Sequence, residues 1–413
     1  MEPRKGGVGL KPVEHPADRH GDGFSDPQPG ATFADELARL PLDDLLAVSE
    51  EASPSRVQQA LQSDPMARTL EDFAALLSPA AGERLEALAA ASHRLTVARF
   101  GRTMRMYAPL YLSNECLTTC TYCGFAREIP IARKTLSRDE TVEEARHLMR
   151  DGFRSILLLT GEHERLTGIE FLVDRIRTLA AEVPQLSVEV QVWSEEEYRR
   201  LVEAGCEGTV IYQETYHPET YSRVHLGGRK RGYRWRLLGP ERAARAGMRR
   251  VGIGALLGLH SDWRYDAVAM AAHARFLMRR YWRSQVSVSV PRLRPSPAGF
   301  QPERPIEDQE MVRLICALRL VLPDAGLVLS SREAPPVRDG LFRVGITHAS
   351  AGSHTEPGGY EHPDEATGQF EVADTRSPKE VAAVLRRLGY DVVWEDWARV
   401  TPSSERMLAG AGR

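Results

Sequence analysis

From residue 104 onward, short apolar runs alternate with longer segments whose apolar residues recur every three or four positions, and this alternation most restricts the fold. Short runs bounded by turn residues are typical of strands, whereas the longer spacing indicates amphipathic helices. Strands are expected over residues 106–114, 155–161, 186–192, 208–214, 250–259, 286–295, 326–333 and 346–353. Helices are expected over residues 141–152, 168–183, 194–205, 240–247, 265–282, 308–324, 337–345 and 377–390.

Strands that are each followed by a helix predict an α/β fold, a closed (β/α)8 barrel of the TIM type. Runs such as SILLL and IGALLGL are almost continuously apolar, as strands covered on both faces are. A six-unit open barrel and a doubly wound open sheet are the competing topologies, and the number of units favours closure.

The chain has 413 residues, enough for one large core or two domains. Residues 1–31 are rich in Gly, Pro, Asp and His and predict a disordered tail. Residues 32–100 predict a helical region without chemistry, and the barrel is expected over residues 101–375. Residues 376–413 are expected to be a C-terminal helix and tail that close the barrel.

The composition is that of an ordinary globular protein, with 42% hydrophobic and 27% charged residues and a net charge of −3. This balance gives no electrostatic reason to expect a nucleic-acid or membrane-surface partner. No apolar run is long enough to span a membrane, and the first residues lack the apolar core of a signal peptide. We therefore expect a cytoplasmic protein.

Three of the five cysteines, Cys116, Cys120 and Cys123, lie within eight positions, whereas Cys206 and Cys316 are isolated. An odd number of cysteines, three of them clustered, is a poor basis for a disulfide framework. It suggests a metal site in a reducing compartment.

Thiolates at this spacing can surround one side of an iron–sulfur cube and leave its fourth iron without a protein ligand. A structural zinc site is the alternative, but zinc needs four ligands. The nearest further candidate, His163, follows a different predicted strand, and the sequence offers no second cysteine pair.

Polar residues follow almost every predicted strand, and in such barrels the reacting groups lie at the carboxyl ends of strands. We therefore expect the cysteine loop to lie at the carboxyl end of the barrel, which we call the mouth. The polar residues expected there are Asn114, Glu115, Gly161, Glu162, Glu189, Gln191, Gln213, Glu214, Arg292, Arg294, Arg332, Glu333, Ser350 and Ser353.

The segment CLTTCTYC resembles the signature of the radical S-adenosylmethionine (radical SAM) enzymes. This resemblance implies one [4Fe-4S] cluster on Cys116, Cys120 and Cys123, with S-adenosyl-L-methionine (SAM) chelating the open iron. It also implies that a 5′-deoxyadenosyl radical abstracts hydrogen from the substrate. Tyr122 is expected near the adenine, with Phe125 just beyond it.

Other segments resemble the SAM-binding elements of this family. TGEH resembles the motif that binds the amino group of SAM, which implies that role for Gly161 and Glu162. Glu189 and Gln191 stand where ribose hydroxyls bind, and Glu214 is placed in the same cofactor site. Gly252 and Gly254 resemble the glycines beside the adenine, although glycines in a strand also serve helix packing alone.

The resemblance extends from about residue 77 to 397 and is greatest to the aromatic-amino-acid lyase branch, within it to the tyrosine lyases that make 2-iminoacetate. PLYLSNEC, RKTL, IYQETYHPETYSRVHL, SVSVPRLRP, LSSRE and PGGY carry it. It implies cleavage of the Cα–Cβ bond of L-tyrosine to 2-iminoacetate (dehydroglycine) and 4-cresol, for the thiazole moiety of thiamine. It also implies two partners, a thiazole synthase and a reducing donor such as flavodoxin.

Arg332 in SSRE is expected to bind the substrate carboxylate, with Tyr111 and Ser350 bordering the same pocket. An ion pair with Glu333 or another acid is the structural alternative for Arg332. Arg292 and Arg294 are expected either in this pocket or as partners that neutralise Glu189 and Glu214. Structural roles are expected for His163 and His217, and catalytic participation is their alternative.

Other related enzymes, and a protein without catalytic activity, are alternatives to a tyrosine lyase. A tryptophan lyase and a deazaflavin-type tyrosine radical enzyme share the branch, and so does the tyrosine lyase of hydrogenase maturation, which carries a second cysteine-bound cluster. The absence of cysteine after Cys316 disfavours the last. A non-catalytic iron–sulfur scaffold would need the cysteines but not Glu162, Glu189 or the glycine-containing strand.

Overall fold

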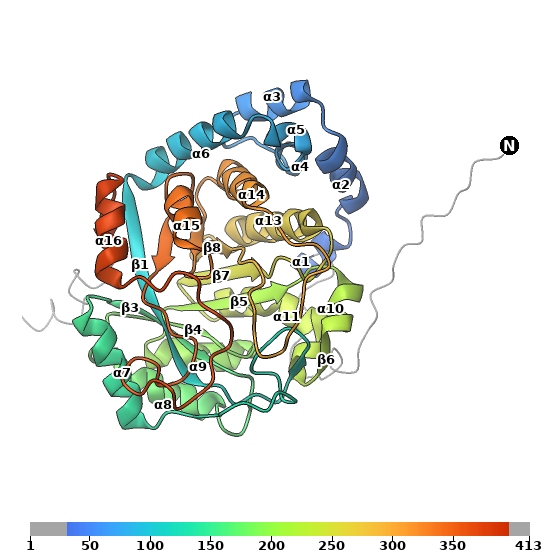
Figure 1. Cartoon of the computed structure of the whole chain (residues 1–413). Helices are drawn as coiled ribbons and strands as arrows, with labels where there is room; N and C mark the ends of the chain where they lie inside the picture. Colours follow the sequence, from blue (N-terminus) through green and yellow to red (C-terminus); the bar gives the residue numbers. More distant parts are fainter. Residues whose placement is uncertain (1–30, 396–413) are drawn as a thin grey trace, which may run out of the picture.

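A computed structural model describes residues 31–395 of the chain (Figure 1). The predicted disordered tail therefore lies almost wholly outside the described residues, as does the end of the predicted C-terminal segment. Among the described residues, no helix combines the length and the apolar character needed to cross a membrane.

Parallel strands form a closed barrel, as predicted. Within residues 31–395 its eight strands are β1 (Thr103–Ser113), β3 (Ser155–Thr160), β4 (Gln185–Glu189), β5 (Gly208–Glu214), β7 (Arg250–Ala255), β8 (Gln285–Ser289), β9 (Gly326–Leu329) and β10 (His348–Ser350). Each pairs with the next, and β10 pairs back with β1 between Arg105–Tyr107 and His348–Ser350. This last pairing closes the ring and rules out both open-sheet alternatives.

Helices cover the outer face of the barrel, because each strand is followed by an amphipathic segment. In chain order they are α7 (Arg138–Arg150), α8 (Ile169–Ala180), α9 (Glu195–Ala204), α12 (Gly239–Arg245), α13 (Trp263–Arg280), α14 (Asp308–Val321), α15 (Pro335–Phe342) and α16 (Pro378–Arg387). Helix α9 is capped by Gly205, whose φ of 111° is left-handed, a conformation that glycine adopts readily.

Several strands end earlier than the apolar pattern predicts. Strand β7 ends at Ala255, and the following apolar residues turn across the end of the barrel. There the backbone N–H of Leu256 donates to the carbonyl of Glu214, and Leu257 forms only an isolated bridge with Arg292. The apolar pattern thus extends past the end of β7 because the residues of the following loop are buried as well.

Additional elements between β5 and β7 lie beside the cysteine loop. They are α10 (Pro218–Val224), β6 (His225–Gly227), the 3₁₀ helix η2 (Arg229–Arg231) and α11 (Tyr233–Leu237). Strand β6 pairs antiparallel with β2 (Thr119–Cys120), which lies within the cysteine loop. This two-stranded sheet fixes the cysteine loop to the insertion after β5.

The N-terminal helices form a layer over α13 and α14, coloured blue in Figure 1. They are α1 (Phe33–Leu37), α2 (Leu42–Glu51), α3 (Pro54–Gln62), α4 (Leu70–Leu76), α5 (Pro79–Gly82) and α6 (Leu85–Phe100). Phe33 anchors the first of them, because its buried ring stacks on His273 with centroids 4.0 Å apart.

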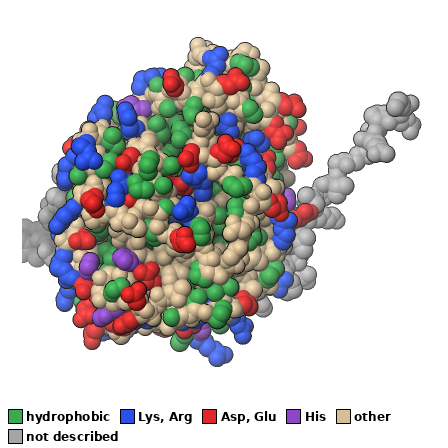
Figure 2. Space-filling view, viewed as in Figure 1, with side chains coloured by type: hydrophobic (Ala, Val, Ile, Leu, Met, Phe, Trp, Pro, Cys, Tyr) green, Lys and Arg blue, Asp and Glu red, His purple; other side chains and the backbone are tan. Residues whose placement is uncertain are grey.

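At the other end of the chain, β11 (Asp391–Val393) pairs in parallel with the first residues of β1, and Trp394 packs edge-on against Phe153. Strand β11 thus lies at the amino-terminal end of the barrel. On the face drawn in Figure 2, basic and acidic side chains are interspersed.

Candidate active site

The three clustered cysteines lie on the loop that follows β1, at the carboxyl end of the barrel. Cys116 and Cys120 are buried and Cys123 is half-buried. The hydroxyl of Thr118 lies 3.0 Å from Sγ of Cys116 and 3.5 Å from Sγ of Cys120. Together with the pairing of β2 and β6, these contacts give the thiols defined positions.

Arg133 holds this loop through hydrogen bonds to its backbone, a role that was not predicted from the sequence. Its guanidinium donates to the backbone carbonyls of Asn114 (2.6 Å), Phe125 (3.2 Å), Ala126 (2.8 Å) and Ile129 (3.2 Å). The planar, permanently charged fork of arginine suits this task because one side chain satisfies several carbonyls.

Gly161, at the end of β3, is required by the close approach of the same loop. A Cβ atom there would lie 2.2 Å from the carbonyl oxygen of Glu115 and 3.0 Å from Cβ of Cys116. The next residue, Glu162, accepts from the backbone N–H of Leu117 through its carbonyl at 2.8 Å. The TGEH segment therefore supports the cysteine loop directly.

Burial makes two of the thiols harder to deprotonate. It raises the pKa of Cys120 to about 12, although Lys230 opposes the rise. Burial, followed by the neighbouring Cys123, also raises the pKa of Cys116. Within residues 31–395, no three His, Cys, Asp or Glu side chains are placed to hold a single ion. A buried loop that presents three thiols fits an iron–sulfur cluster, whose irons take thiolate ligands.

The two predicted aromatic neighbours of the cofactor take different positions. Tyr122 borders a cavity at the mouth, and its hydroxyl lies 2.9 Å from Nε2 of His225. Phe125 packs instead under the loop, edge-on to Tyr111 with ring centroids 5.9 Å apart. Only Tyr122 of the pair therefore borders that cavity.

Two carboxylates and two cations form a network on the same side of the mouth, with Glu214 and Arg236 buried and Glu162 and Lys230 half-buried. Glu162 accepts from Arg236 at 3.0 Å, Arg236 lies 3.7 Å from Glu214, and Lys230 pairs with Glu214 at 2.8 Å. Burial lowers the pKa of Lys230 and of Arg236, but the two glutamates outweigh it and raise both above their usual values. The network therefore favours the charged forms of Lys230 and Arg236.

Glu214 has a strained backbone that orients it toward this network. Its φ is 69°, in the left-handed region, and the pairing of β5 with β7 shifts register between Tyr212 and Glu214. Such irregularities redirect a side chain at the end of a strand, and non-glycine residues keep this conformation where the surroundings enforce it.

Glu189 borders the mouth cavity and has an unusual proton affinity. Burial, followed by the charge of Glu214, raises the pKa of Glu189 to about 7, although Arg332 opposes the rise. Near the end of the same strand, the side-chain nitrogen of Gln191 is buried and has no hydrogen-bond partner among the described residues. A buried polar atom without a partner indicates room for a polar ligand, so the donor set fits the predicted cofactor.

Arg332 lies in the mouth with its guanidinium over the ring of Phe370, 3.5 Å from the ring centroid. The alternative ion pair with Glu333 is not formed, because Nε of Arg292 donates to both oxygens of that carboxylate at 3.1 Å. Arg292 also pairs with Asp308 at 2.8 Å. The idea that Arg292 neutralises Glu189 or Glu214 is therefore wrong.

Tyr111 and Ser350 lie at different depths. The hydroxyl of Tyr111 donates to Oε1 of Gln369 at 3.0 Å, and Nε2 of Gln369 donates to Sγ of Cys123 at 3.4 Å. The side chain of Ser350 is hydrogen-bonded to Tyr107, whose pKa is raised to about 12 by burial. Tyr111 is thus linked to the cysteine loop, and Ser350 belongs to a lower layer of the barrel.

The glycines of β7 make room inside the barrel. A Cβ atom on Gly254 would lie 2.4 Å from the ring of Tyr212, and Gly252 borders the interior below the mouth. His163 and His217 have local structural roles, because Nδ1 of each accepts a backbone N–H, from Leu166 and Thr220, at 3.2 Å.

Four residues of the mouth were missed by the sequence analysis: Lys230, Arg236, Gln369 and Phe370. Lys230 lies in the basic run RKR, and Arg236 follows soon after it, so both resembled residues of a solvated surface. Gln369 and Phe370 belong to a long segment after β10 without periodicity, where no sequence signal indicates that the chain returns across the mouth.

Comparisons with known proteins agree with this site. Residues 110–270 match the model of the Radical SAM superfamily, and residues 289–391 match the Biotin and Thiamin Synthesis associated domain. The crystal structure of HydG, a maturase of the [FeFe]-hydrogenase, is 30% identical with a TM-score of 0.82, covering 89% of this chain and 83% of that chain.

Two curated relatives are more similar in sequence. The chain is 42% identical to a 2-iminoacetate synthase of Escherichia coli and 41% identical to one of Salmonella typhimurium. Both matches cover 89% of this chain and 97% of the relative. With its cysteine loop and barrel, the chain therefore belongs to the radical SAM superfamily and, within it, to the family of the 2-iminoacetate synthases.

Proposed function

We propose that this protein cleaves the Cα–Cβ bond of L-tyrosine to give 2-iminoacetate and 4-cresol. A [4Fe-4S] cluster and SAM supply a 5′-deoxyadenosyl radical for hydrogen abstraction. Overall, L-tyrosine, SAM, two electrons and one proton give 2-iminoacetate, 4-cresol, 5′-deoxyadenosine and methionine. The 2-iminoacetate serves the thiazole moiety of thiamine.

One observation carries this proposal: the thiol loop, the buried charge network and Arg332 open on the same mouth. Cys123, Glu189, Glu214, Lys230 and Arg332 all border one cavity there. A scaffold that only holds a cluster needs the thiols but not a buried set of charges, which is costly unless it binds something.

The chain's own residues divide the binding of SAM among them. Glu162 would accept from the ammonium group of its methionine half, and Lys230 and Arg236 would pair with its carboxylate. Glu189 and Gln191 offer polar atoms to the ribose, and Tyr122 offers its ring to the adenine. The existing pairs among these residues keep the charges in place before the cofactor enters.

The substrate is held by its carboxylate. Arg332 presents a guanidinium whose orientation is fixed by Phe370, which suits bidentate binding of a carboxylate. Tyr111 borders the same region and is itself held by Gln369. Precise placement matters because the abstracted hydrogen must lie close to the attacking carbon.

Two protein partners follow from the chemistry. A reducing donor such as flavodoxin supplies the electrons, and a thiazole synthase consumes the imine, which hydrolyses readily in water. Both belong to the cytoplasm, where we place the protein.

The test is anaerobic turnover of reconstituted protein with reductant, SAM and an equal mixture of tyrosine and tryptophan, followed by mass spectrometry of the products. We expect 4-cresol and 5′-deoxyadenosine, and neither from a Cys120→Ala variant. Indole products without cresol would assign the chain to tryptophan, and the absence of 5′-deoxyadenosine would refute radical SAM chemistry.

A further inference from the structure

The inner face of this barrel is accessible in a way that the interior of a TIM-type barrel usually is not. On β4, β5 and β8 the inward residues Ser187, Val210 and Ser287 are half-buried, whereas their neighbours along each strand are buried beneath the helices. Barrel interiors are normally filled by layers of Val, Ile and Leu. Here several of those positions carry small or polar side chains, so the core is not filled.

The unfilled interior is a cavity of about 400 Å³, which we call the lumen. Its lower part is bordered by residues at the starts of strands, including Gln285 of β8 and Thr103 of β1. Its upper part is bordered by Glu189 and Tyr212, which also border the mouth cavity. Trp282, 77% exposed, stands at the lower rim. The lumen therefore extends from beneath the mouth to solvent at the opposite end of the barrel.

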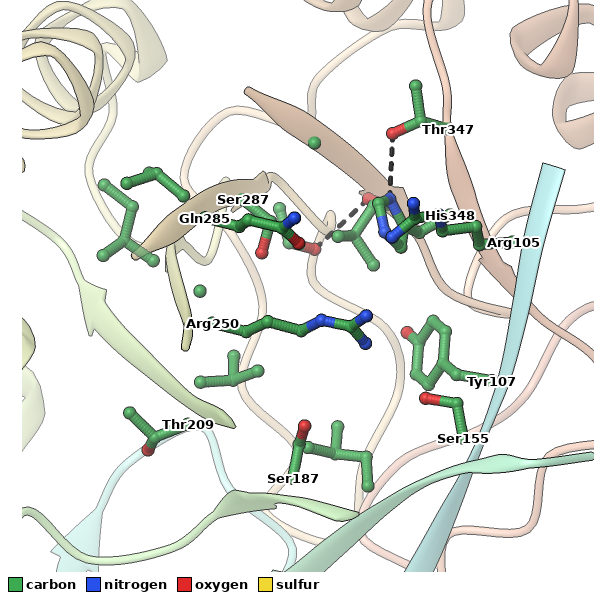
Figure 3. Close-up of a pocket in the computed structure, with 18 of the residues that line it drawn as sticks. Arg105, Tyr107, Ser155, Ser187, Thr209, Arg250, Gln285, Ser287, Thr347 and His348 are labelled. Atoms are coloured by element: carbon green, nitrogen blue, oxygen red, sulfur yellow. Dashed lines mark hydrogen bonds between the residues drawn. The ribbon is translucent and has the colours of Figure 1, made fainter. Parts of the chain in front are cut away.

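Cationic and hydrogen-bonding groups line the lower half of the lumen (Figure 3). The guanidinium of Arg250 extends across it toward Tyr107, and Arg105 and His348 border the same space. Nη1 of Arg250 also donates to Gln185 at 3.3 Å, which steadies the side chain. Of the acidic groups that border the lumen, Glu189 lies at the top, and Asp324 at the bottom is paired with Arg99.

We propose that the lumen is the exit route of the two-carbon carboxylate product and that Arg250 is its binding group on the way out. This inference rests on the proposed function, which supplies 2-iminoacetate as the product. The route leads away from the cysteine loop and ends among the loops that precede the strands.

Position and chemistry support this route. Of the groups assigned to SAM, Tyr122 and Lys230 border the mouth cavity and not the lumen, whereas Glu189 lies at the top of the lumen. A product released downward does not have to pass the cofactor fragments. A small anion is attracted toward the positive charge of Arg250. Serine and threonine hydroxyls of the lumen can donate hydrogen bonds to the anion, and the surrounding barrel limits the contact of the anion with bulk water.

The first test measures binding without turnover. Oxamate, a stable planar two-carbon carboxylate, is titrated calorimetrically into anaerobic holoenzyme. We expect Arg250→Gln to weaken binding by about 10-fold or more, the loss of one charge-assisted contact. Arg249→Gln is the matched control, because the neighbouring Arg249 side chain is 60% exposed and lies 3.7 Å from Glu207. The proposal is overturned if the wild type does not bind oxamate, or if Arg250→Gln and Arg249→Gln bind oxamate equally well.

The second test obstructs the lumen. Ser187→Phe places a ring in the cavity, and Ser187→Ala is the control without added bulk. We expect Ser187→Phe to retain the 4-cresol amplitude of the first turnover but to lower the steady-state rate by about 5-fold or more, because product release becomes limiting. Ser287→Phe obstructs the lumen from β8, and it replaces Ser187→Phe in this test if that variant does not fold.

The outcomes separate the two proposals. If the wild type makes no cresol, the proposed function fails, and oxamate binding still decides whether Arg250 binds a carboxylate. If cresol forms and both obstructed variants turn over at the wild-type steady-state rate, the exit route is refuted while the proposed function stands.

Discussion

Gln369 is expected to set the reduction potential of the cluster. Its Nε2 donates to Sγ of Cys123 at 3.4 Å, and an N–H directed at a cluster sulfur stabilises the more negative, reduced state. A single such bond contributes about 0.5–1.5 kcal/mol. For a one-electron couple this corresponds to about 20–65 mV, so Gln369→Ala should lower the midpoint potential by that amount.

The measurement is a redox titration of anaerobically reconstituted protein, followed by electron paramagnetic resonance. Gln369→Glu removes the donor and adds a negative charge, so it should lower the potential further. Gln301→Ala, at an exposed glutamine, is the matched control and should leave the potential unchanged. An unchanged or raised potential in Gln369→Ala, with a normal iron content, would refute the reasoning.

Further predictions concern the substrate, acidity and stability. Arg332→Ala should weaken L-tyrosine binding by about 10–100-fold while SAM cleavage falls far less, and equal losses in assays of both would contradict the anchoring role. Burial raises the pKa of Asp266 to about 7, so the folded chain retains a proton that the unfolded chain releases above about pH 4. Stability should therefore fall as the pH rises toward 7, and Asp266→Asn should reduce that fall in thermal unfolding; parallel curves would refute this. Arg338→Met breaks a fully buried pair with Asp374 and should destabilise the fold by about 3–5 kcal/mol in denaturant titrations, whereas Arg146→Ala at the surface should change little. Equal effects of these two substitutions would contradict the role of burial.

Much of the fold could be predicted because its signals are local. Periodicity identified the strands and the covering helices, and their number implied the closure that the pairing of β10 with β1 makes. The spacing of Cys116, Cys120 and Cys123 likewise needs no distant residue to be recognised. The strand ends were less accurate, because the loop after β7 is as apolar as the strand itself.

Residues that reach the site from far along the chain could not be predicted. Gln369 lies 246 positions from the cysteine it contacts, and Phe370 follows it without any periodic pattern. Arg292 was expected near Glu189 and Glu214, but in the folded chain its guanidinium donates to Glu333 instead. Which of several acids an arginine meets depends on the packing of loops, and packing is a property of the whole barrel.

The sequence by itself determined the alternation of strands and helices and a loop of three thiols suited to an iron–sulfur cluster. Only the tertiary structure decided which charges meet at the mouth and that the barrel interior stays open. The inward positions of β4, β7 and β8 carry Ser187, Gly252 and Ser287, each unremarkable in its own strand. Their common effect, an unfilled and partly charged lumen, exists only when the strands are closed into a ring, because closure brings small residues from distant strands face to face.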